Sequence, residues 1–214
     1  MADAAIRILL VDDHQVVRQG FRTMLAATPD LAVAGEAPDA ATALQLLSTT
    51  HFHLVCVDIA LPDVSGLDLL KTIRSRWPEQ PVLVISMYSE EAYAVRAFKL
   101  GASGYLTKNT EPDVLFTAIR RAAAGRRYVT PELGERLAEE LALGPARSGH
   151  DGLSEREFEV LRRIALGQGL AEIAEDLHLS AKTVTTYRAR ILQKLGVRSN
   201  AELVRYAVDH QIVT

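Results

Sequence analysis

The chain has 214 residues, enough for two domains of ordinary size or one large one. Charged residues make up 24% of it and hydrophobic residues 48%, which is typical of folded globular proteins and excludes a disordered chain. No apolar stretch approaches the roughly 20 residues of a membrane span, and the N-terminus lacks the cationic start of a signal peptide. The one cysteine, Cys56, excludes a disulfide framework. We therefore expect a cytoplasmic protein with no membrane association.

Short apolar runs that alternate with helical patterns predict an α/β domain in the first part of the chain. The runs typical of buried strands are Ile6–Val11, Leu31–Gly35, Leu54–Val57, Pro81–Ser86 and Gly104–Thr107. Helical periodicity follows each run, over about 16–28, 39–47, 67–76, 90–100 and 112–124. Such alternation favours a doubly wound, five-stranded parallel sheet with right-handed crossovers. The flavodoxin-like strand order 2-1-3-4-5 is the order we expect, with a ligand where the first and third strands end.

The pattern loosens after this domain and then becomes purely helical. Over 126–150 we expect a linker with a short helix near Glu132–Leu141, followed by the Gly-, Pro- and Ser-rich stretch LGPARSGHDG. Beyond it, Ser154 and Glu157 predict a capping box, and Ser180 a second helix start. The four predicted helices cover 155–166, 170–177, 181–195 and 200–210. The predicted domains are therefore 1–125, the linker, and an all-α, four-helix unit over 151–214.

Polar side chains follow four of the five predicted strands. Asp12 and Asp13 follow the first strand, Asp58 the third, Ser86 ends the fourth and Lys108 follows the fifth. Each alone reads as a turn or surface residue, but together they meet at the carboxyl edge of a parallel sheet, where ligands bind. Three carboxylates repel one another unless a cation such as Mg²⁺ neutralises them. A carboxylate nucleophile, a hydroxyl and a lysine are the groups that formation of an acyl phosphate requires.

The strings LLVDDH, DIALPDVSGLDLL, VLVISM and GASGYLTK resemble the receiver domain of bacterial two-component response regulators, over about Ile6–Ala124. The resemblance implies that Asp58 is the phosphoacceptor. It further implies that Asp12, Asp13 and Asp58, with the backbone carbonyl of Ala60, hold Mg²⁺. Ala60 is a small residue beside the acceptor, which leaves room for an attacking water.

The same resemblance assigns Ser86 as the switch hydroxyl and Lys108 as the phosphate-sensing lysine. Tyr105 is implied to be the switch aromatic, the alternative being a half-buried strand tyrosine. Two residues depart from the family pattern. Met87 stands where a small residue is usual, so we expect a changed phosphoryl lifetime. Asn109 stands where proline is frequent, so we expect no cis peptide bond there.

A basic segment without acids covers Ala181–Arg198, although residues 151–214 hold nine basic and nine acidic residues in all. Arg and Lys neutralise DNA phosphates, while Thr and Ala can touch base edges, so the segment predicts a DNA-contacting helix. A solvated cationic helix face is the alternative. The predicted contact residues are Lys182, Thr183, Thr185, Thr186, Arg188, Ala189, Arg190 and Lys194.

The stretch Leu153–Ala207 resembles the LuxR-type helix-turn-helix domain, most specifically in its KTV and KLGVRS strings. With the receiver, the chain resembles the NarL/FixJ class of transcriptional regulators. The resemblance implies a scaffold helix over 171–177, a recognition helix over 181–195 in the major groove, and a last helix that pairs two subunits on an inverted repeat. Departures at Gln168–Ala171 and at Tyr187 leave the phosphate contacts and the base preference open.

These patterns together predict a response regulator rather than an enzyme acting on other molecules. A sensor histidine kinase or a small phosphodonor would phosphorylate Asp58, and the phosphorylated protein would bind double-stranded DNA as a homodimer and contact RNA polymerase. One alternative is a Mg²⁺-dependent phosphatase of aspartyl-phosphate type, which would want a carboxylate where Ala60 stands. The other is a DNA-binding protein whose receiver no longer takes phosphate and serves only to dimerise.

Overall fold

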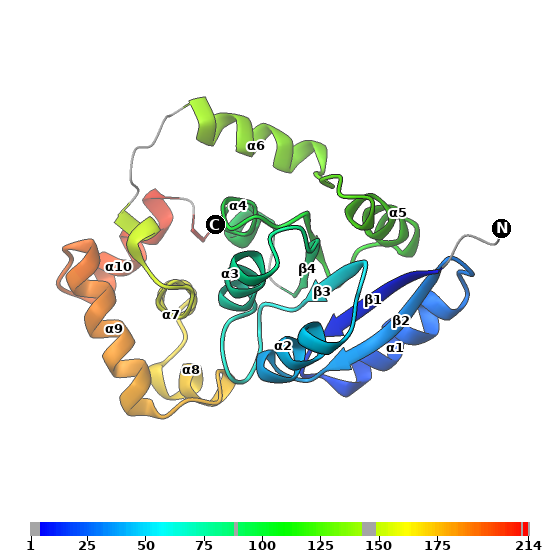
Figure 1. Cartoon of the computed structure of the whole chain (residues 1–214). Helices are drawn as coiled ribbons and strands as arrows, with labels where there is room; N and C mark the ends of the chain where they lie inside the picture. The colour runs from blue at the N-terminus through cyan, green and yellow to red at the C-terminus, as the bar shows by residue number, and fades with distance from the viewer. Residues whose placement is uncertain (1–4, 88–89, 143–148, 211, 214) are drawn as a thin grey trace. The chain divides into compact units, whose positions relative to one another are not determined.

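The computed structural model describes residues 5–87, 90–142, 149–210 and 212–213. The chain forms two compact units, Met1–Leu137 and Ala138–Thr214, and each is described by itself (Figure 1). Among the described residues, no helix combines the length and the apolar character needed to cross a membrane.

The first unit is built on a five-stranded sheet in the order β2-β1-β3-β4-β5, and every pairing is parallel. The predicted fold class and strand order are therefore confirmed. The β2 strand runs two residues beyond its predicted end, and the β1–β2 register shifts between Ile8 and Leu9. The shift pairs Glu36 with Leu10, close to the acidic end of β1. The strands are β1 (Ile6–Val11), β2 (Leu31–Ala37), β3 (Leu54–Val57), β4 (Val82–Ser86) and β5 (Gly104–Thr107).

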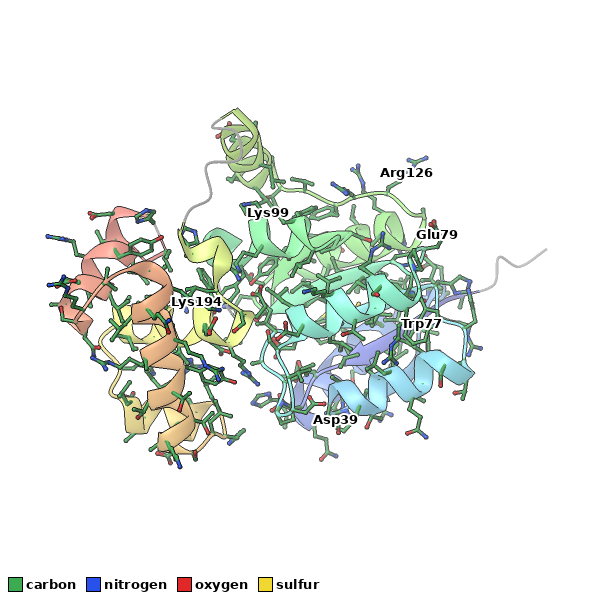
Figure 2. The ribbon with its side chains drawn as sticks, turned by 60° about the vertical axis from the view of Figure 1, so that its left-hand side comes forward. Asp39, Trp77, Glu79, Lys99, Arg126 and Lys194 are labelled. Atoms are coloured by element: carbon green, nitrogen blue, oxygen red, sulfur yellow. The ribbon has the colours of Figure 1, made fainter. Side chains whose placement is uncertain are left out.

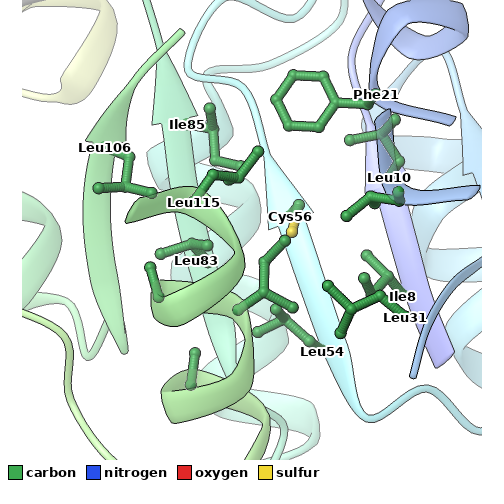
Figure 3. Packing of buried hydrophobic residues seen from close by; sticks show 14 residues of the cluster. Ile8, Leu10, Phe21, Leu31, Leu54, Cys56, Leu83, Ile85, Leu106 and Leu115 are labelled. Carbon is green, nitrogen blue, oxygen red and sulfur yellow. The ribbon is translucent and has the colours of Figure 1, made fainter. Parts of the chain in front are cut away.

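Helices cover both faces of this sheet. On one face α1 and α5 pack on alternate strand residues, and Cys56 lies among them with 2% of its surface exposed (Figure 3). Burial raises the pKa of the Cys56 thiol to about 12, which suits a packing residue rather than a reactive one. The helices are α1 (Gln15–Ala26), α2 (Ala40–Thr49), α3 (Gly66–Arg76), α4 (Glu90–Lys99) and α5 (Pro112–Ala123).

Helix starts follow the chemistry of their capping residues. The Asp39 side chain accepts a hydrogen bond from the Thr42 N–H at 2.7 Å and begins α2. Asp63, in the connection after β3, accepts from the Ala40 and Ala41 N–H groups, both at 3.1 Å. The loop that follows Asp58 is thereby tied to the start of α2.

The second unit is helical, as predicted. The capping box at its first long helix is present: the Ser154 N–H donates to Glu157 Oε2 at 2.7 Å, and the Glu157 N–H donates to Ser154 Oγ at 3.3 Å. Gly196, with φ of 67°, ends the longest helix in the left-handed conformation that favours glycine. The helices here are α7 (Glu155–Ala165), α8 (Leu170–Asp176), α9 (Ala181–Leu195) and α10 (Asn200–Asp209).

The segment between the domains contains more regular structure than the predicted linker. Helix α6 (Pro131–Ala142) corresponds to the short helix expected near residues 132–141. Residues 143–148 of the predicted linker lie outside the described residues. Immediately after them, Gly149–Gly152 form a turn of 3₁₀ helix that the sequence pattern does not indicate.

Candidate functional site

The carboxyl edge of the sheet brings together the acids that follow β1 and β3. Asp12 and Asp58 are buried, with 2% and 4% of their surfaces exposed. Backbone bonds continue the ladder up to these residues, since the Asp58 N–H donates to Val11 O at 2.9 Å and the Asp12 N–H to Ala37 O at 3.1 Å. The positions of both carboxylates are therefore set by the sheet itself.

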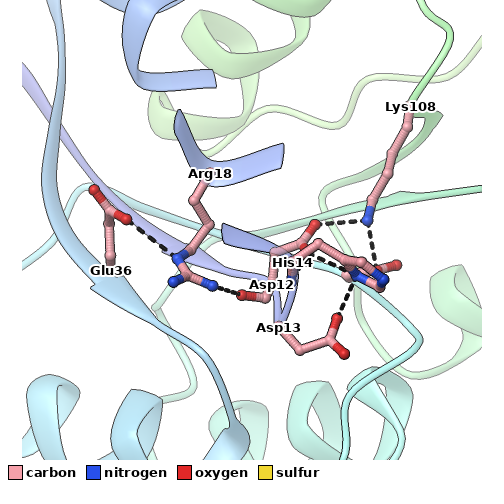
Figure 4. A network of polar contacts seen from close by, with 7 residues as sticks. Asp12, Asp13, His14, Arg18, Glu36 and Lys108 are labelled. Carbon is pink, nitrogen blue, oxygen red and sulfur yellow. Dashed lines mark hydrogen bonds and ion pairs between the residues drawn. The ribbon is translucent and has the colours of Figure 1, made fainter. Parts of the chain in front are cut away.

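Lys108 bridges the two buried carboxylates, and its contact with Asp12 can be followed in Figure 4. Its Nζ lies 2.6 Å from Asp12 Oδ2 and 2.7 Å from Asp58 Oδ2. The Lys108 N–H also donates to Ser86 O at 2.8 Å, which holds the ends of β4 and β5 together. Burial alone would lower the pKa of Lys108, but attraction to Asp58 and Asp12 outweighs it and the pKa is raised. The lysine is thus a cation built into the site.

Asp58 is held between opposing influences. Burial, with repulsion from Asp12, raises its pKa above the ordinary value, although Lys108 and the Ser86 hydroxyl act in the opposite direction. Its Oδ1 is buried and has no hydrogen-bond partner among the described residues. A buried oxygen of this kind is suited to bind a cation or to react.

His14 joins this group, and the sequence pattern gives no indication of it. Its Nδ1 lies 2.6 Å from Asp13 Oδ1 and 3.5 Å from Asp12 Oδ1. One ligand atom from each of Asp12, Asp13, His14 and Asp58 lies within 4.8 Å of all the others. Three carboxylates, one of which (Asp58) has an oxygen without a hydrogen-bond partner among the described residues, fit a hard divalent cation such as Mg²⁺.

An arginine on α1 links Asp12 to Glu36 on the outer strand β2. Arg18 on α1 donates through Nη1 to the backbone carbonyl of Asp12 at 2.5 Å and through Nε to Glu36 Oε2 at 3.2 Å. Arg22 contacts the same carboxylate at 3.4 Å. The extension of β2 that carries Glu36 therefore contributes to the position of Asp12.

Close backbone contact holds the connection after β3. A Cβ atom on Gly66 would lie 1.9 Å from the carbonyl oxygen of Asp58, and the Gly66 N–H donates to Ile59 O at 2.8 Å. Ala60 lies inside the loop that these contacts close. Only glycine fits at position 66 without moving Asp58.

The other residues expected at this site lie in different settings. Tyr105 is fully buried in β5, with 0% of its surface exposed, rather than half-buried. Met87 is 66% exposed and follows the end of β4. Asn109 is exposed, and every peptide bond among the described residues is trans.

The second charged region is the surface of α9. A hollow of about 300 Å³ is lined by residues of this helix alone. Two hydroxyls are used within the helix, since Thr185 donates to Ala181 O at 2.8 Å and Thr186 to Lys182 O at 2.9 Å. Thr183 belongs to the N-cap, with its N–H bonded to Ser180 Oγ. The lining residues are Lys182, Thr183, Thr186, Tyr187 and Arg190.

The basic residues of α9 differ in what they contact. Lys182, Arg190 and the small residue Ala189 are exposed. Arg188 donates through Nε to Asn200 Oδ1 at 2.6 Å. Lys194 lies near the end of α9 (Figure 2), and its Nζ is 2.6 Å from Glu157 Oε2 and 3.1 Å from Gly152 O. Lys194 is therefore exposed like Lys182 and Arg190, but its ammonium is paired with a carboxylate at the start of α7.

Comparison with known proteins supplies a context for both regions. The profile of the response regulator receiver domain matches residues 8–120, and that of the luxR family of bacterial regulatory proteins matches residues 151–207. Response regulator GacA of Pseudomonas aeruginosa is 36% identical over 97% of this chain and 98% of its own. Transcriptional regulatory protein UhpA of Escherichia coli is 37% identical over 95% and 98%.

Solved structures agree with these matches. RcsB from Salmonella enterica serovar Typhimurium, bound to promoter rprA in the presence of the phosphomimetic BeF3⁻, is 28% identical. The similarity covers 94% of this chain and 98% of that one, with a TM-score of 0.61. The resemblance therefore covers both units and is not confined to one of them.

Proposed function

This chain belongs to the response-regulator family of two-component systems, with a receiver domain and a LuxR-type DNA-binding domain, and we propose that phosphorylation of Asp58 controls its binding to DNA. One observation carries the proposal. The buried carboxylate of Asp58 has one oxygen 2.7 Å from Lys108 Nζ and the other without a hydrogen-bond partner among the described residues. The second oxygen is free to attack phosphorus while the first stays neutralised.

Each neighbour of Asp58 has a role in that step. Asp58 Oδ1 forms the bond to phosphorus as the bond between phosphorus and the donor's leaving atom breaks, so a histidine kinase or a small phosphodonor both suit it. Lys108 forms an ion pair with one phosphoryl oxygen, and the Ser86 hydroxyl donates a hydrogen bond to another. Asp12, Asp13 and Asp58, with the carbonyl of Ala60, would hold Mg²⁺, which neutralises charge between carboxylates and phosphoryl oxygens when bound.

When Asp58 is phosphorylated, its carboxylate becomes an acyl phosphate and the negative charge lies on the phosphoryl oxygens. This changes the contacts of Lys108 and Ser86. Both are pulled toward the new phosphoryl oxygens, and the end of β4 and the start of the β5–α5 connection move with them. Tyr105, buried in β5 beside these residues, repacks in response. Such a shift between two packings is how a local charge alters a distant surface.

The helix α9 is the DNA-contacting element in this proposal. Exposed Lys182 and Arg190 neutralise phosphates, and Thr185, Thr186 and Ala189 face base edges in the major groove. Phosphorylation favours a homodimer, so two copies of α9 meet an inverted repeat in double-stranded DNA. Because its partners are DNA, a sensor kinase and RNA polymerase, we place the protein in the cytoplasm.

Both alternatives are weakened by particular residues. A phosphatase of aspartyl-phosphate type needs a second carboxylate two residues after its nucleophile, and Ala60 stands there. A receiver that has lost phosphorylation would not be expected to keep Asp12, Asp58 and Lys108 in close contact. The chain thus catalyses its own phosphorylation and dephosphorylation only.

The test compares wild type with Asp58→Ala, with and without BeF3⁻ and Mg²⁺. A duplex is first selected from a random library by the BeF3⁻-treated wild type, and its binding is followed by fluorescence anisotropy. Oligomeric state is measured by light scattering, and intact mass after acetyl phosphate treatment reports the phosphoryl group. We expect tighter binding, dimerisation and one phosphoryl group in wild type and none of these responses in Asp58→Ala.

The control is Asp113→Asn, which removes an exposed carboxylate in the first turn of α5. It should respond as wild type does. A wild type that gains no phosphoryl group and does not change its oligomeric state would overturn the proposal.

A further inference from the structure

We infer that His14 is a fourth ligand of the acidic pocket and that it makes the pocket prefer first-row transition-metal ions, Mn²⁺ and Co²⁺ among them, over Mg²⁺. The inference rests on the proposed function, because it requires the pocket to hold a divalent cation. It adds a residue and a metal preference to that function.

The geometry places an imidazole nitrogen among the carboxylates. His14 Nδ1 lies 2.6 Å from Asp13 Oδ1 and 3.5 Å from Asp12 Oδ1. With Asp58, these residues offer four ligand atoms that all lie within 4.8 Å of one another. For one cation to bind all four atoms, the contact between His14 and Asp13 has to open and the side chains have to rotate.

The His14 ring is directed to the acids and does not serve as a helix cap. His14 occupies the N-cap position of α1, but its side chain makes no capping hydrogen bond there. Its backbone is held instead: the His14 N–H donates to Asp12 Oδ1 at 2.8 Å, and its carbonyl accepts from the Arg18 N–H at 3.1 Å. The ring is thus positioned beside the acids by the backbone.

A second observation points to a ligand at this place. Asp58 Oδ1 is buried and lacks a hydrogen-bond partner among the described residues, so desolvation of that oxygen is not compensated by the protein. The His14 side chain is 63% exposed, against 3% for Asp12. The imidazole therefore lies on the solvent side of the carboxylates, where a hydrated cation enters.

The ligand set decides between cations. Mg²⁺ binds oxygen ligands and retains several waters, so it gains little from an imidazole. First-row transition-metal ions accept nitrogen and oxygen together, and their affinity for such sites rises from Mn²⁺ to Co²⁺ and beyond. Replacing one water by His14 nitrogen would strengthen their binding and leave Mg²⁺ binding unchanged.

The experiment measures the preference in the full chain. Bound Mn²⁺ is quantified by electron paramagnetic resonance of the free ion, Mg²⁺ by competition against Mn²⁺, and Co²⁺ by its visible absorption spectrum. For His14→Ala and His14→Asn we expect Mn²⁺ and Co²⁺ affinity to fall about tenfold or more with Mg²⁺ affinity unchanged. The Co²⁺ spectrum should also change in both variants, and two different replacements guard against one misfolding.

A matched control is His51→Ala, which removes an exposed histidine that comes before β3, at the opposite end of that strand from Asp58. It should match wild type for all three ions. Equal changes in Mg²⁺ and Mn²⁺ affinity, or none, in the His14 variants would overturn the inference and leave the proposed function standing. A wild type that binds neither ion would overturn both.

Discussion

The carboxyl edge of the sheet and the surface of α9 are both charged, but they are built in opposite ways. At the sheet edge the groups come from the ends of several strands, and Lys108 has only 8% of its side chain exposed. On α9 the residues come from one helix, and Lys182 and Arg190 face solvent. The first region exists only when the whole sheet has formed, whereas the second needs only a helix.

This difference sets what a substitution in each region can do. Charges at the sheet edge lie a few ångströms apart in a buried setting, so they interact strongly and salt screens them little. Charges on α9 are hydrated and cost little to remove from the folded protein, and in the proposed function they act mainly on DNA. Changes at the edge should therefore appear in folding stability, and changes on α9 in binding.

The largest expected effect is at Gly66. Alanine there would place Cβ 1.9 Å from the Asp58 carbonyl oxygen, so the loop after β3 must move. We expect Gly66→Ala to lower the free energy of unfolding of the first unit by roughly 3 kcal/mol, the upper range for overpacking. Denaturant unfolding followed by fluorescence measures it, because the single tryptophan, Trp77, directly follows α3 in this unit.

Gly20 provides the matched control for this prediction. It lies in the exposed middle of α1, and a Cβ there meets nothing within 4 Å. Gly20→Ala should raise the free energy of unfolding by up to about 1 kcal/mol, since alanine favours helix. Equal effects of the two substitutions would show that the sheet edge does not depend on this close approach.

The next effect concerns DNA affinity and its dependence on salt. Lys182→Gln or Arg190→Gln removes an exposed cation, so each should reduce the slope of log affinity against log salt concentration by about one. Because this term is independent of sequence, fluorescence anisotropy on any duplex over a series of NaCl concentrations measures it. The free energy of unfolding should stay within about 0.5 kcal/mol of wild type.

Lys194→Gln is the contrasting variant on the same helix. Its Nζ contacts Glu157 Oε2 at 2.6 Å, so this ammonium is already paired with a carboxylate of the protein, although 41% of its side chain is exposed. Its removal should change the salt slope by clearly less than the removal of Lys182 does. A loss of slope as large as that of Arg190→Gln would mean that the bond to Glu157 opens on DNA.

The two regions also differ in how much of them the sequence predicts. Strand ends are visible in the sequence because an apolar run stops at a polar residue, so Asp12, Asp58, Ser86 and Lys108 could be predicted to share one edge. Their closeness then follows from the parallel order of the strands. The structure does bring Asp12, Asp58 and Lys108 into direct contact.

What could not be predicted depends on contacts between distant residues. The ring nitrogen of His14 lies 2.6 Å from Asp13 Oδ1, and no periodicity in the sequence indicates that contact. Neither the extension of β2 to Ala37, which includes Glu36, nor the register shift between Ile8 and Leu9 is visible in the apolar pattern of the sequence. On α9, helical spacing identifies the exposed face, but it does not indicate the ion pair between Lys194 and Glu157, which lies 37 positions earlier in the chain.

The smallest expected effect is at Glu157 and Lys194, where a buried carboxylate is paired with a partly exposed ammonium. Burial would raise the pKa of Glu157, but Lys194 and the Ser154 N–H outweigh it and hold the pKa below its ordinary value of 4.5. A carboxylate whose pKa is lowered by folding stabilises the folded state above the unfolded pKa. That contribution is lost as the pH falls through the lower, folded value.

Glu157→Gln isolates this contribution. Glutamine can still accept from the Ser154 N–H in a capping box, so only the charge is lost. Above pH 5 we expect α7 to be less stable in Glu157→Gln by less than about 1 kcal/mol, because the Lys194 side chain is 41% exposed. Below the folded pKa of Glu157 the stabilities of α7 in the two proteins should converge.

Hydrogen exchange of the α7 amides, measured as a function of pH, tests this, with Glu175→Gln on α8 as the control for loss of an exposed carboxylate. Parallel pH profiles for wild type and Glu157→Gln would mean that the ion pair contributes nothing to the stability of α7, and that Lys194 should be grouped with Lys182 and Arg190.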